Sequence, residues 1–313
     1  MSWRPTVEPE VVKEPPEAAV DLVIEPHERD LGDGFTVRRL LPAAKQRSVG
    51  PFVFFDHFGP THLGPGRGLD VRPHPHINLA TITYLFEGEI VHRDNLGSLQ
   101  TITPGDVNWM TAGSGIVHSE RTPPGLRVKG TSVHGLQLWV GLPREHEEAP
   151  PAFHHYAAAA LPAFGDGGVQ IRVLAGEAYG HRSPVATLSR LVYLDVRLAA
   201  GAAIELPDDL GDRGVYVVEG LVTCGGQAFS PTHMLAFGPG RRAQLRAEAP
   251  SRFVLVGGDR FAEPRHLWWN FVSSSESRIE QAKRDWRERR GDPAGPFPLV
   301  PGDDGEFIPL PDR

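Results

Sequence analysis

Glycine and proline interrupt this chain at short intervals. Its 313 residues include 35 Gly and 30 Pro, and the segments between them are short and rich in Val, Ile, Thr and aromatic residues. Proline breaks helices, and short β-branched runs bounded by turn residues are typical of strands. The sequence therefore predicts an all-β protein. The predicted strands are 22–24, 35–40, 80–87, 90–94, 99–102, 107–110, 115–120, 134–140, 169–174, 191–198, 214–219, 234–237 and 252–257.

The length predicts two domains, because 313 residues exceed what one hydrophobic core usually organises. The segment 141–162, GLPREHEEAPPAFHHYAAAALP, mixes charge, Pro and Ala and is typical of a crossover that contains a helical turn. The predicted division is an acidic, Pro-rich tail at 1–20, one barrel at 21–150, a second barrel at 151–272, and a helix with an extended tail at 273–313.

A short internal repeat indicates that the two halves of the chain are related. The sequence YLFEG begins at Tyr84, and YVVEG begins at Tyr216, each followed by strand-like sequence. A duplicated barrel would explain the match. The alternative is that apolar strands ending in Glu-Gly turns recur by chance.

One helix is predicted near the C-terminus. The residues from Ser273 to Glu276 have the spacing of a capping box, and good helix formers follow until Gly291. The basic end of this segment complements the helix dipole, so its charges indicate a solvated face.

The overall charge and apolar pattern exclude several functions. A net charge of -7 argues against direct nucleic-acid binding, which needs clustered Lys and Arg. No apolar run is long enough to span a bilayer, and the N-terminus has acidic and Pro residues where a signal peptide needs a basic start. Cys224 is the only cysteine and cannot form an internal disulfide. We expect a soluble cytoplasmic protein that binds neither nucleic acid nor membrane.

Two pairs of side chains that can bind metals are each spaced two residues apart. His74 and His76 lie in the sequence PHPH, and His118 and Glu120 follow the small-residue turn TAGSG. Residues two apart on a strand point to the same face, so both pairs could enter one barrel interior. Three imidazoles and a carboxylate suit a divalent transition metal with open positions. The alternative is accidental spacing among 14 His.

Four longer motifs carry a resemblance to a known family. The runs VGPFVFFDHFGP, PHPH with TITYLFEGEIVHRDNLG, PGDVNWMTAGSGIVHSE and HGLQLWVGLP resemble the pirin family of the cupin superfamily, over about residues 34–143. This resemblance implies two stacked cupin barrels of the jelly-roll type, with one iron in the N-terminal barrel. Carried over by motif, the ligands it implies are His74, His76, His118 and Glu120.

The chain departs from the family at one place beside the site. Many pirins continue the His motif with Arg-Gly-Phe-Glu, whereas this chain has INLA at 77–80. The usual motif glutamate is not a ligand in pirins, so the resemblance still implies metal binding, with an altered surrounding of the site.

Alignment of the two halves predicts that the second barrel lacks a metal. Positions that correspond to the His pair are Leu206 and Asp208, and those that correspond to His118 and Glu120 are Leu245 and Ala247.

Other residues have both a functional and a structural interpretation. His57 and His92 could orient the ligands, or could be structural histidines. Phe52, Phe54 and Met110 could line a pocket for a flat aromatic substrate, although alternating apolar residues on strands more often belong to the core.

The predicted function is that of a metal-dependent dioxygenase. The resemblance implies a quercetin 2,3-dioxygenase with Fe(2+), while manganese, nickel, copper, cobalt or zinc would also suit the donor set. Glu120 could be both ligand and catalytic base for a substrate hydroxyl. The resemblance also allows a non-enzymatic regulator, in which the redox state of the iron changes affinity for a protein partner. A third interpretation is a structural protein with vestigial ligands.

Overall fold

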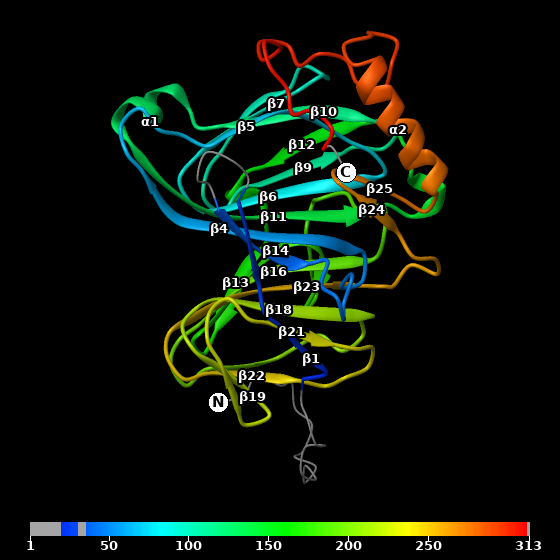
Figure 1. Ribbon diagram of the computed structural model, residues 1–313. Coiled ribbons are helices and arrows are strands. Elements are labelled where there is room, and N and C mark those ends of the chain that lie inside the picture. The colour runs from blue at the N-terminus through cyan, green and yellow to red at the C-terminus, as the bar shows by residue number, and fades with distance from the viewer. Residues whose placement is uncertain (1–19, 31–35, 312–313) are drawn as a thin grey trace. The chain divides into compact units, whose positions relative to one another are not determined.

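The computed structural model describes residues 20–30 and 36–311, which form two compact units (Figure 1). The first barrel comprises Glu28–Pro42, Phe52–Ala158 and Phe261–Arg313. The second barrel comprises Ala43–Pro51, Ala159–Arg260 and the segment that ends at His27. The predicted tail at 1–20 lies outside the described residues except for residue 20, and so does residue 35 of a predicted strand.

The first barrel is built from two antiparallel sheets. The larger has the order β12 (Ala152–Tyr156), β9 (Val107–Thr111), β6 (Leu79–Glu87), β11 (Thr131–Gly141), β4 (Phe52–Leu63), β3 (Thr36–Leu41) and β2 (His27–Asp30). The smaller has the order β5 (Asp70–His76), β10 (Ile116–Arg121), β7 (Ile90–Asp94) and β8 (Leu99–Ile102). This unit also contains the short helix α1 (Pro124–Lys129), the 3₁₀ turns η1 (Arg144–His146) and η2 (Ala158–Ala160, at its boundary), and the hairpin β24 (His266–Trp268) and β25 (Phe271–Ser273).

The second barrel repeats the two-sheet plan. Its larger sheet has the order β1 (Leu22–Ile24), β21 (Met234–Phe237), β18 (Asp212–Glu219), β23 (Ser251–Gly258), β16 (Leu191–Leu198), β14 (Val169–Ala178) and β13 (Ala163–Asp166), with β15 (His181–Arg182) paired to β14. Its smaller sheet has the order β17 (Ala203–Glu205), β22 (Gln244–Ala247), β19 (Val222–Cys224) and β20 (Gln227–Phe229). The predicted all-β fold of two barrels is confirmed.

The two repeated sequences, which begin at Tyr84 and Tyr216, lie on equivalent strands of the two barrels. β6 lies between β9 and β11, and β18 lies between β21 and β23. Each strand is followed by a glycine with positive φ, 86° at Gly88 and 85° at Gly220. In the second barrel, Leu206, Leu245 and Ala247 belong to one buried apolar cluster. Apolar side chains therefore fill three of the four positions that correspond to predicted metal ligands, and the fourth, Asp208, is exposed and pairs with Arg242.

Several strand boundaries match the predictions to the residue, whereas the predicted strands include neither the longer β4 and β5 nor several short strands, most of them in the second half of the chain. β4 contains a Gly-Pro sequence and β5 contains Pro73 and Pro75, which are usually breakers of strands. The pairing of β5 accommodates Pro73 with a bulge, because two residues lie between Val71 and His74 while only one lies between their partners Glu120 and His118.

The two units interleave along the chain, unlike the four consecutive segments of the predicted division. β1 pairs with β21 of the second barrel, while the C-terminal 261–313 belongs to the first. An apolar cluster explains this return, because Ile77 and Val117 of the first barrel pack with Phe271, Ile279 and residues further along the C-terminal segment. The helix and tail are therefore part of a barrel.

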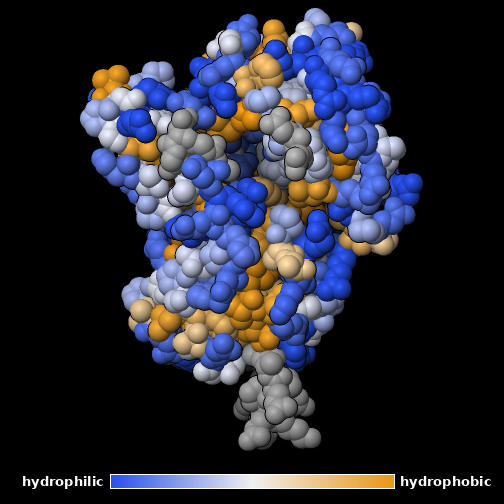
Figure 2. Space-filling model, viewed as in Figure 1, coloured by the Kyte–Doolittle hydropathy of each residue, from blue (hydrophilic) through white to orange (hydrophobic). Residues whose placement is uncertain are grey.

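The predicted helix is confirmed as α2 (Glu276–Glu288), but the predicted capping box is wrong. Its N-cap is Ser275, which makes no capping hydrogen bond through its side chain. The hydroxyl of Ser273 is directed to the carboxylate of Glu147 instead. Buried Glu147 needs donors more strongly than an exposed helix end does. Figure 2 shows a predominantly hydrophilic surface over α2, and no helix of the described residues is long and apolar enough to cross a membrane.

The turn before β10 depends on glycine. Gly113 has a φ of 50°, and a Cβ added there would lie 1.8 Å from the carbonyl oxygen of Ala149. Gly97 also has a positive φ, 90°, but nothing lies within 4 Å of its added Cβ. A side chain at Gly97 would therefore meet only an unfavourable backbone conformation, whereas a side chain at Gly113 would also clash with the backbone of Ala149.

We predict that Gly113→Ala lowers the free energy of unfolding by about 3 kcal/mol or more, since it combines strain with a backbone clash. Gly97→Ala should cost about 1 kcal/mol, from the left-handed backbone alone. Denaturant unfolding of both variants checks this expectation. Equal losses would show that the clash at Gly113 relaxes freely.

Candidate metal centre

The pairing of β5 with β10 brings the predicted His residues together. His74 lies opposite His118, and His76 lies opposite Ile116 in the antiparallel register. The ring nitrogens of His74, His76 and His118 lie within 4.8 Å of one another. All three side chains are buried. The structure therefore assembles three of the four predicted ligands at one point.

Backbone carbonyls orient two of these imidazoles. His74 Nδ1 lies 2.8 Å from the carbonyl oxygen of Arg72, and His76 Nδ1 lies 3.0 Å from that of Asn270. A carbonyl oxygen can only accept, so each Nδ1 carries the proton and each Nε2 keeps its lone pair. This arrangement of a ligand histidine and its partner is usual in metal sites.

A relay of two side chains orients the third imidazole. Asp94 accepts a hydrogen bond from His92 Nε2 at 3.0 Å, which leaves the lone pair of His92 on Nδ1. His118 Nδ1 lies 3.4 Å from that atom and can donate to it. The Nε2 of His118 is then unprotonated. It is buried and has no hydrogen-bond partner among the described residues.

Burial keeps these imidazoles neutral. Desolvation lowers the pKa of His74 to about 4, and it lowers the pKa values of His76 and His118 well below their usual range. The neighbouring histidines act in the same direction on His76 and His118. Metal ligation needs the neutral form of histidine. Three neutral rings and a buried, unpartnered nitrogen therefore fit a divalent transition metal ion.

Glu120 lies on the same strand as His118 but is not part of the group within 4.8 Å. Its carboxylate is buried, lines the same cavity as the histidines and lies 2.9 Å from the hydroxyl of Thr83, which donates to it. Desolvation raises the pKa of Glu120. Its role as fourth ligand and as catalytic base therefore stays a prediction.

The three histidines open onto a cavity of about 760 Å³ in the first barrel. Phe54 and Trp139 stack on one wall with ring centroids 3.9 Å apart. The guanidinium of Arg39 lies 4.4 Å from the centre of the Phe54 ring and pairs with Asp56 at 2.8 Å. The cavity therefore combines stacked aromatic rings with many polar and charged groups, and its volume is usual for a small-molecule site.

The exposed charged side chains at the mouth of the cavity carry both signs, because Asp30 and Asp70 line it together with arginines. Arg67 and Arg72 are exposed and line it, and within the described parts of the chain neither guanidinium has an ion-pair partner. Arg127 also lines it, but it pairs with Asp70 at 2.6 Å.

Of the predicted pocket residues, only Phe54 lines the cavity. Phe52 and Met110 are buried in the protein instead, with exposed fractions of 0% and 1%. The pairing of β4 with β11 skips Val53, and this bulge breaks the alternation that would place Phe52 beside Phe54. The pocket assignment of Phe52 and Met110 from the sequence was therefore wrong.

Two predicted partner histidines have different positions. His92 contacts the ligand His118, as described above. His57 lies beside His134, with the two Nε2 atoms 2.7 Å apart, and it does not line the cavity. Burial lowers the pKa of His57 to about 2.

The C-terminal segment supplies part of the cavity wall, which the sequence did not predict. Trp269, Asn270 and Ile308 line the cavity although they lie far along the chain from the His pairs. The aromatic run LWWNF at 267–271 was the only signal of a buried contact in this region.

The residues that depart from the usual family motif have structural roles. Ile77 is fully buried and forms a bridge with Phe271. Asn78 has a φ of 56°, and its amide donates to the carbonyl oxygen of Glu147 at 2.6 Å. Asn accepts this left-handed conformation more readily than most residues. The stretch therefore fixes the turn that follows His76.

We predict that the metal-free protein loses stability as the pH falls below 6.5. The unfolded state protonates His74 near pH 6.5 and the folded state only near pH 4, so the unfolded state binds more protons between these values. His74 alone should account for about 1 to 2 kcal/mol between pH 6.5 and pH 5. Chemical unfolding across this range, compared with His74→Ala, measures the difference. Identical pH slopes for the two proteins would contradict the expectation.

We also predict that Asp94→Asn weakens metal binding by about tenfold or more, because it removes the charge that orients His92 and through it His118. Asp106→Asn is the matched control, since Asp106 is also a buried turn carboxylate but bonds Thr103 and Ala158. Titration with a competing chelator gives both affinities. Equal effects of the two variants would mean that the relay does not support the ligand.

Comparison with known proteins identifies both halves. The pirin family model matches residues 34–140, and the model of the pirin C-terminal cupin domain matches residues 193–292. A pirin-like protein of Caulobacter vibrioides is 48% identical over 296 residues, which cover 94% of this chain and 100% of the relative. Pirin of Mus musculus is 34% identical over 279 residues, 87% of this chain and 93% of the relative.

A solved structure shares the whole architecture. The crystal structure of a protein named quercetin 2,3-dioxygenase from Acinetobacter baumannii has a TM-score of 0.84 and 32% identity, with coverage of 93% of this chain and 96% of that chain. The second half, which lies beyond the motifs at 34–143 that carry the resemblance, is thus matched as well. The chain belongs to the pirin family and consists of two cupin barrels with one C-terminal helix.

Proposed function

We propose that this protein is a mononuclear metal-dependent dioxygenase that opens a ring of a flavonol or catechol, with quercetin as the best candidate substrate. The observation that carries this proposal is the meeting of three buried, neutral imidazoles at a cavity with stacked aromatic walls. The name of the Acinetobacter baumannii relative supports the same substrate.

His74, His76 and His118 would hold the metal, and Glu120 would complete the set by a movement of its carboxylate. Iron in the ferrous state is our favoured occupant, although this donor set also suits manganese, nickel, copper, cobalt and zinc. When bound, such an ion supplies Lewis acidity and open positions for substrate and dioxygen.

The residues around the site would prepare the substrate. Burial raises the pKa of Glu120, so this carboxylate is a better base for a phenolic hydroxyl than an exposed glutamate is. Phe54 and Trp139 offer a flat wall to an aromatic ring. Arg67 and Arg72 at the mouth favour substrates that carry negative charge on phenolic oxygens.

We predict oxygen consumption by the iron-loaded protein with quercetin, measured with an oxygen electrode. His118→Ala should abolish it, and Glu120→Gln should lower kcat by about 100-fold or more. Asp106→Asn should retain the activity of the parent. If iron-loaded parent protein consumes no oxygen with quercetin or related catechols, the dioxygenase proposal fails.

A second candidate function is an iron-dependent regulator that binds a protein partner. One observation favours it: the cavity wall includes the C-terminal Trp269, Asn270 and Ile308, so a change at the metal would reach a segment outside the barrel strands. Affinity for the partner should then differ between ferrous and ferric protein. A protein that binds none of iron, manganese, nickel and copper would instead support the vestigial interpretation.

A further inference from the structure

The hairpin of β24 and β25 supplies the hydrogen-bond partner of a metal ligand. Its two-residue turn is Trp269 and Asn270, and the carbonyl oxygen of Asn270 accepts from His76 Nδ1 at 3.0 Å. This bond fixes both the tautomer and the direction of the His76 ring. The position of the hairpin therefore decides where His76 Nε2 points.

The turn has a strained backbone. Trp269 has a φ of 51°, in a region that a bulky side chain rarely adopts. Such a conformation persists only where the surroundings hold it, and it is common at functional sites. The contacts that fix this hairpin therefore also fix the orientation of His76, through the carbonyl oxygen of Asn270.

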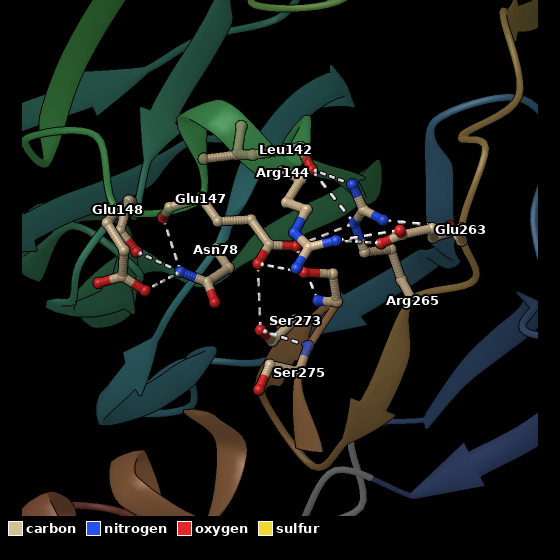
Figure 3. Close-up of polar contacts among 11 residues, drawn as sticks. Asn78, Leu142, Arg144, Glu147, Glu148, Glu263, Arg265, Ser273 and Ser275 are labelled. Carbon is tan, nitrogen blue, oxygen red and sulfur yellow. Dashed lines mark hydrogen bonds and ion pairs between the residues drawn. The ribbon is translucent and has the colours of Figure 1, made fainter. Parts of the chain in front are cut away.

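One buried carboxylate holds both ends of the hairpin (Figure 3). Before β24, Arg265 Nε lies 3.0 Å from Glu147 Oε1. At the end of β25, Ser273 Oγ donates to Glu147 Oε2 at 3.2 Å, and the next residue, Ser274, donates through its backbone nitrogen at 2.7 Å and its hydroxyl at 2.9 Å. The side chains of Arg265 and Glu147 are only 4% and 7% exposed, so little water can replace these bonds.

The backbone of Glu147 also holds the turn that follows the ligand's strand, β5. Its carbonyl oxygen accepts from the side-chain amide of Asn78 at 2.6 Å, two residues after His76. The backbone nitrogen of Asn78 is bonded to Gly113 at 2.8 Å, and Ile77 between them bridges to Phe271 of the hairpin. Glu147 therefore bonds the turn after the ligand's strand through its backbone, and both ends of the hairpin that carries Asn270 through its side chain.

We propose that Glu147 is a positioning residue for the metal ligand His76 and acts through the β24–β25 hairpin. This inference rests on the metal site of the proposed function, but it does not depend on which reaction the metal supports. Glu147 itself is not among the residues that line the cavity. Its effect is transmitted by Asn270 rather than by contact with substrate.

The experiment compares Glu147→Gln with Glu263→Gln in the full chain. Glu263 is the matched control, since it lies just before the hairpin and also pairs with an arginine, Arg144, but the side chains of Glu263 and Arg144 are 53% and 71% exposed. Each variant is titrated with Co²⁺ in competition with a chelator, at a temperature where it is fully folded. The visible absorption of bound Co²⁺, which reports ligand geometry, is recorded in parallel.

We expect Glu147→Gln to weaken Co²⁺ binding by about tenfold and to change its absorption spectrum, while Glu263→Gln leaves both unchanged. If Glu147→Gln does not fold, Ser274→Ala is the second variant. It removes one hydrogen bond to Glu147 but keeps the buried ion pair of Glu147 with Arg265, and it should shift affinity in the same direction by a smaller factor.

A folded Glu147→Gln variant with the affinity and spectrum of the parent would overturn the proposal, whatever its melting temperature. A parent protein that binds no Co²⁺ would overturn it as well, together with the metal site. A parent that binds Co²⁺ but, when loaded with iron, consumes no oxygen would end the dioxygenase proposal alone. Loss of affinity in Glu147→Gln would support the positioning role in that case too.

Discussion

The antiparallel pairing of β5 with β10 is the constraint on which the candidate site depends. It places His74 opposite His118, and a shift of one residue would turn one of these rings to the other face of the sheet. The bulge at Arg72 and Pro73 absorbs the residue that a regular ladder could not accommodate. The prolines around His74 are therefore part of the geometry that gives the two strands their register.

Burial then gives these histidines the properties of ligands. Desolvation favours neutral rings, and each ring has a specific partner that holds its Nδ1: a carbonyl oxygen for His74 and His76, and His92 with Asp94 for His118. These partners come from β5, from the C-terminal hairpin and from β7. The site is consequently only as precise as the packing of these three elements.

The C-terminal segment contributes directly to the geometry of the metal site. A chain that ended after its second barrel would lack the carbonyl oxygen that orients His76 and part of the cavity wall. Glu147 fixes this segment through a buried ion pair with Arg265 and three hydrogen bonds from Ser273 and Ser274 at the end of β25. Ile77 and Asn78, which differ from the usual family motif, contact the same segment. Asn78 donates to the carbonyl oxygen of Glu147, and Ile77 bridges to Phe271 of the hairpin.

The all-β class, the two related barrels and the set of His74, His76 and His118 could be predicted from local periodicity and from motifs that lie close together in the chain. The tertiary structure sets which aromatic residues face the cavity, because a bulge at Val53 breaks the strict alternation of a regular strand. It also decided that the serines before α2 bond Glu147 and that Asn270 holds His76. Those contacts join residues more than a hundred positions apart, and no local pattern encodes them.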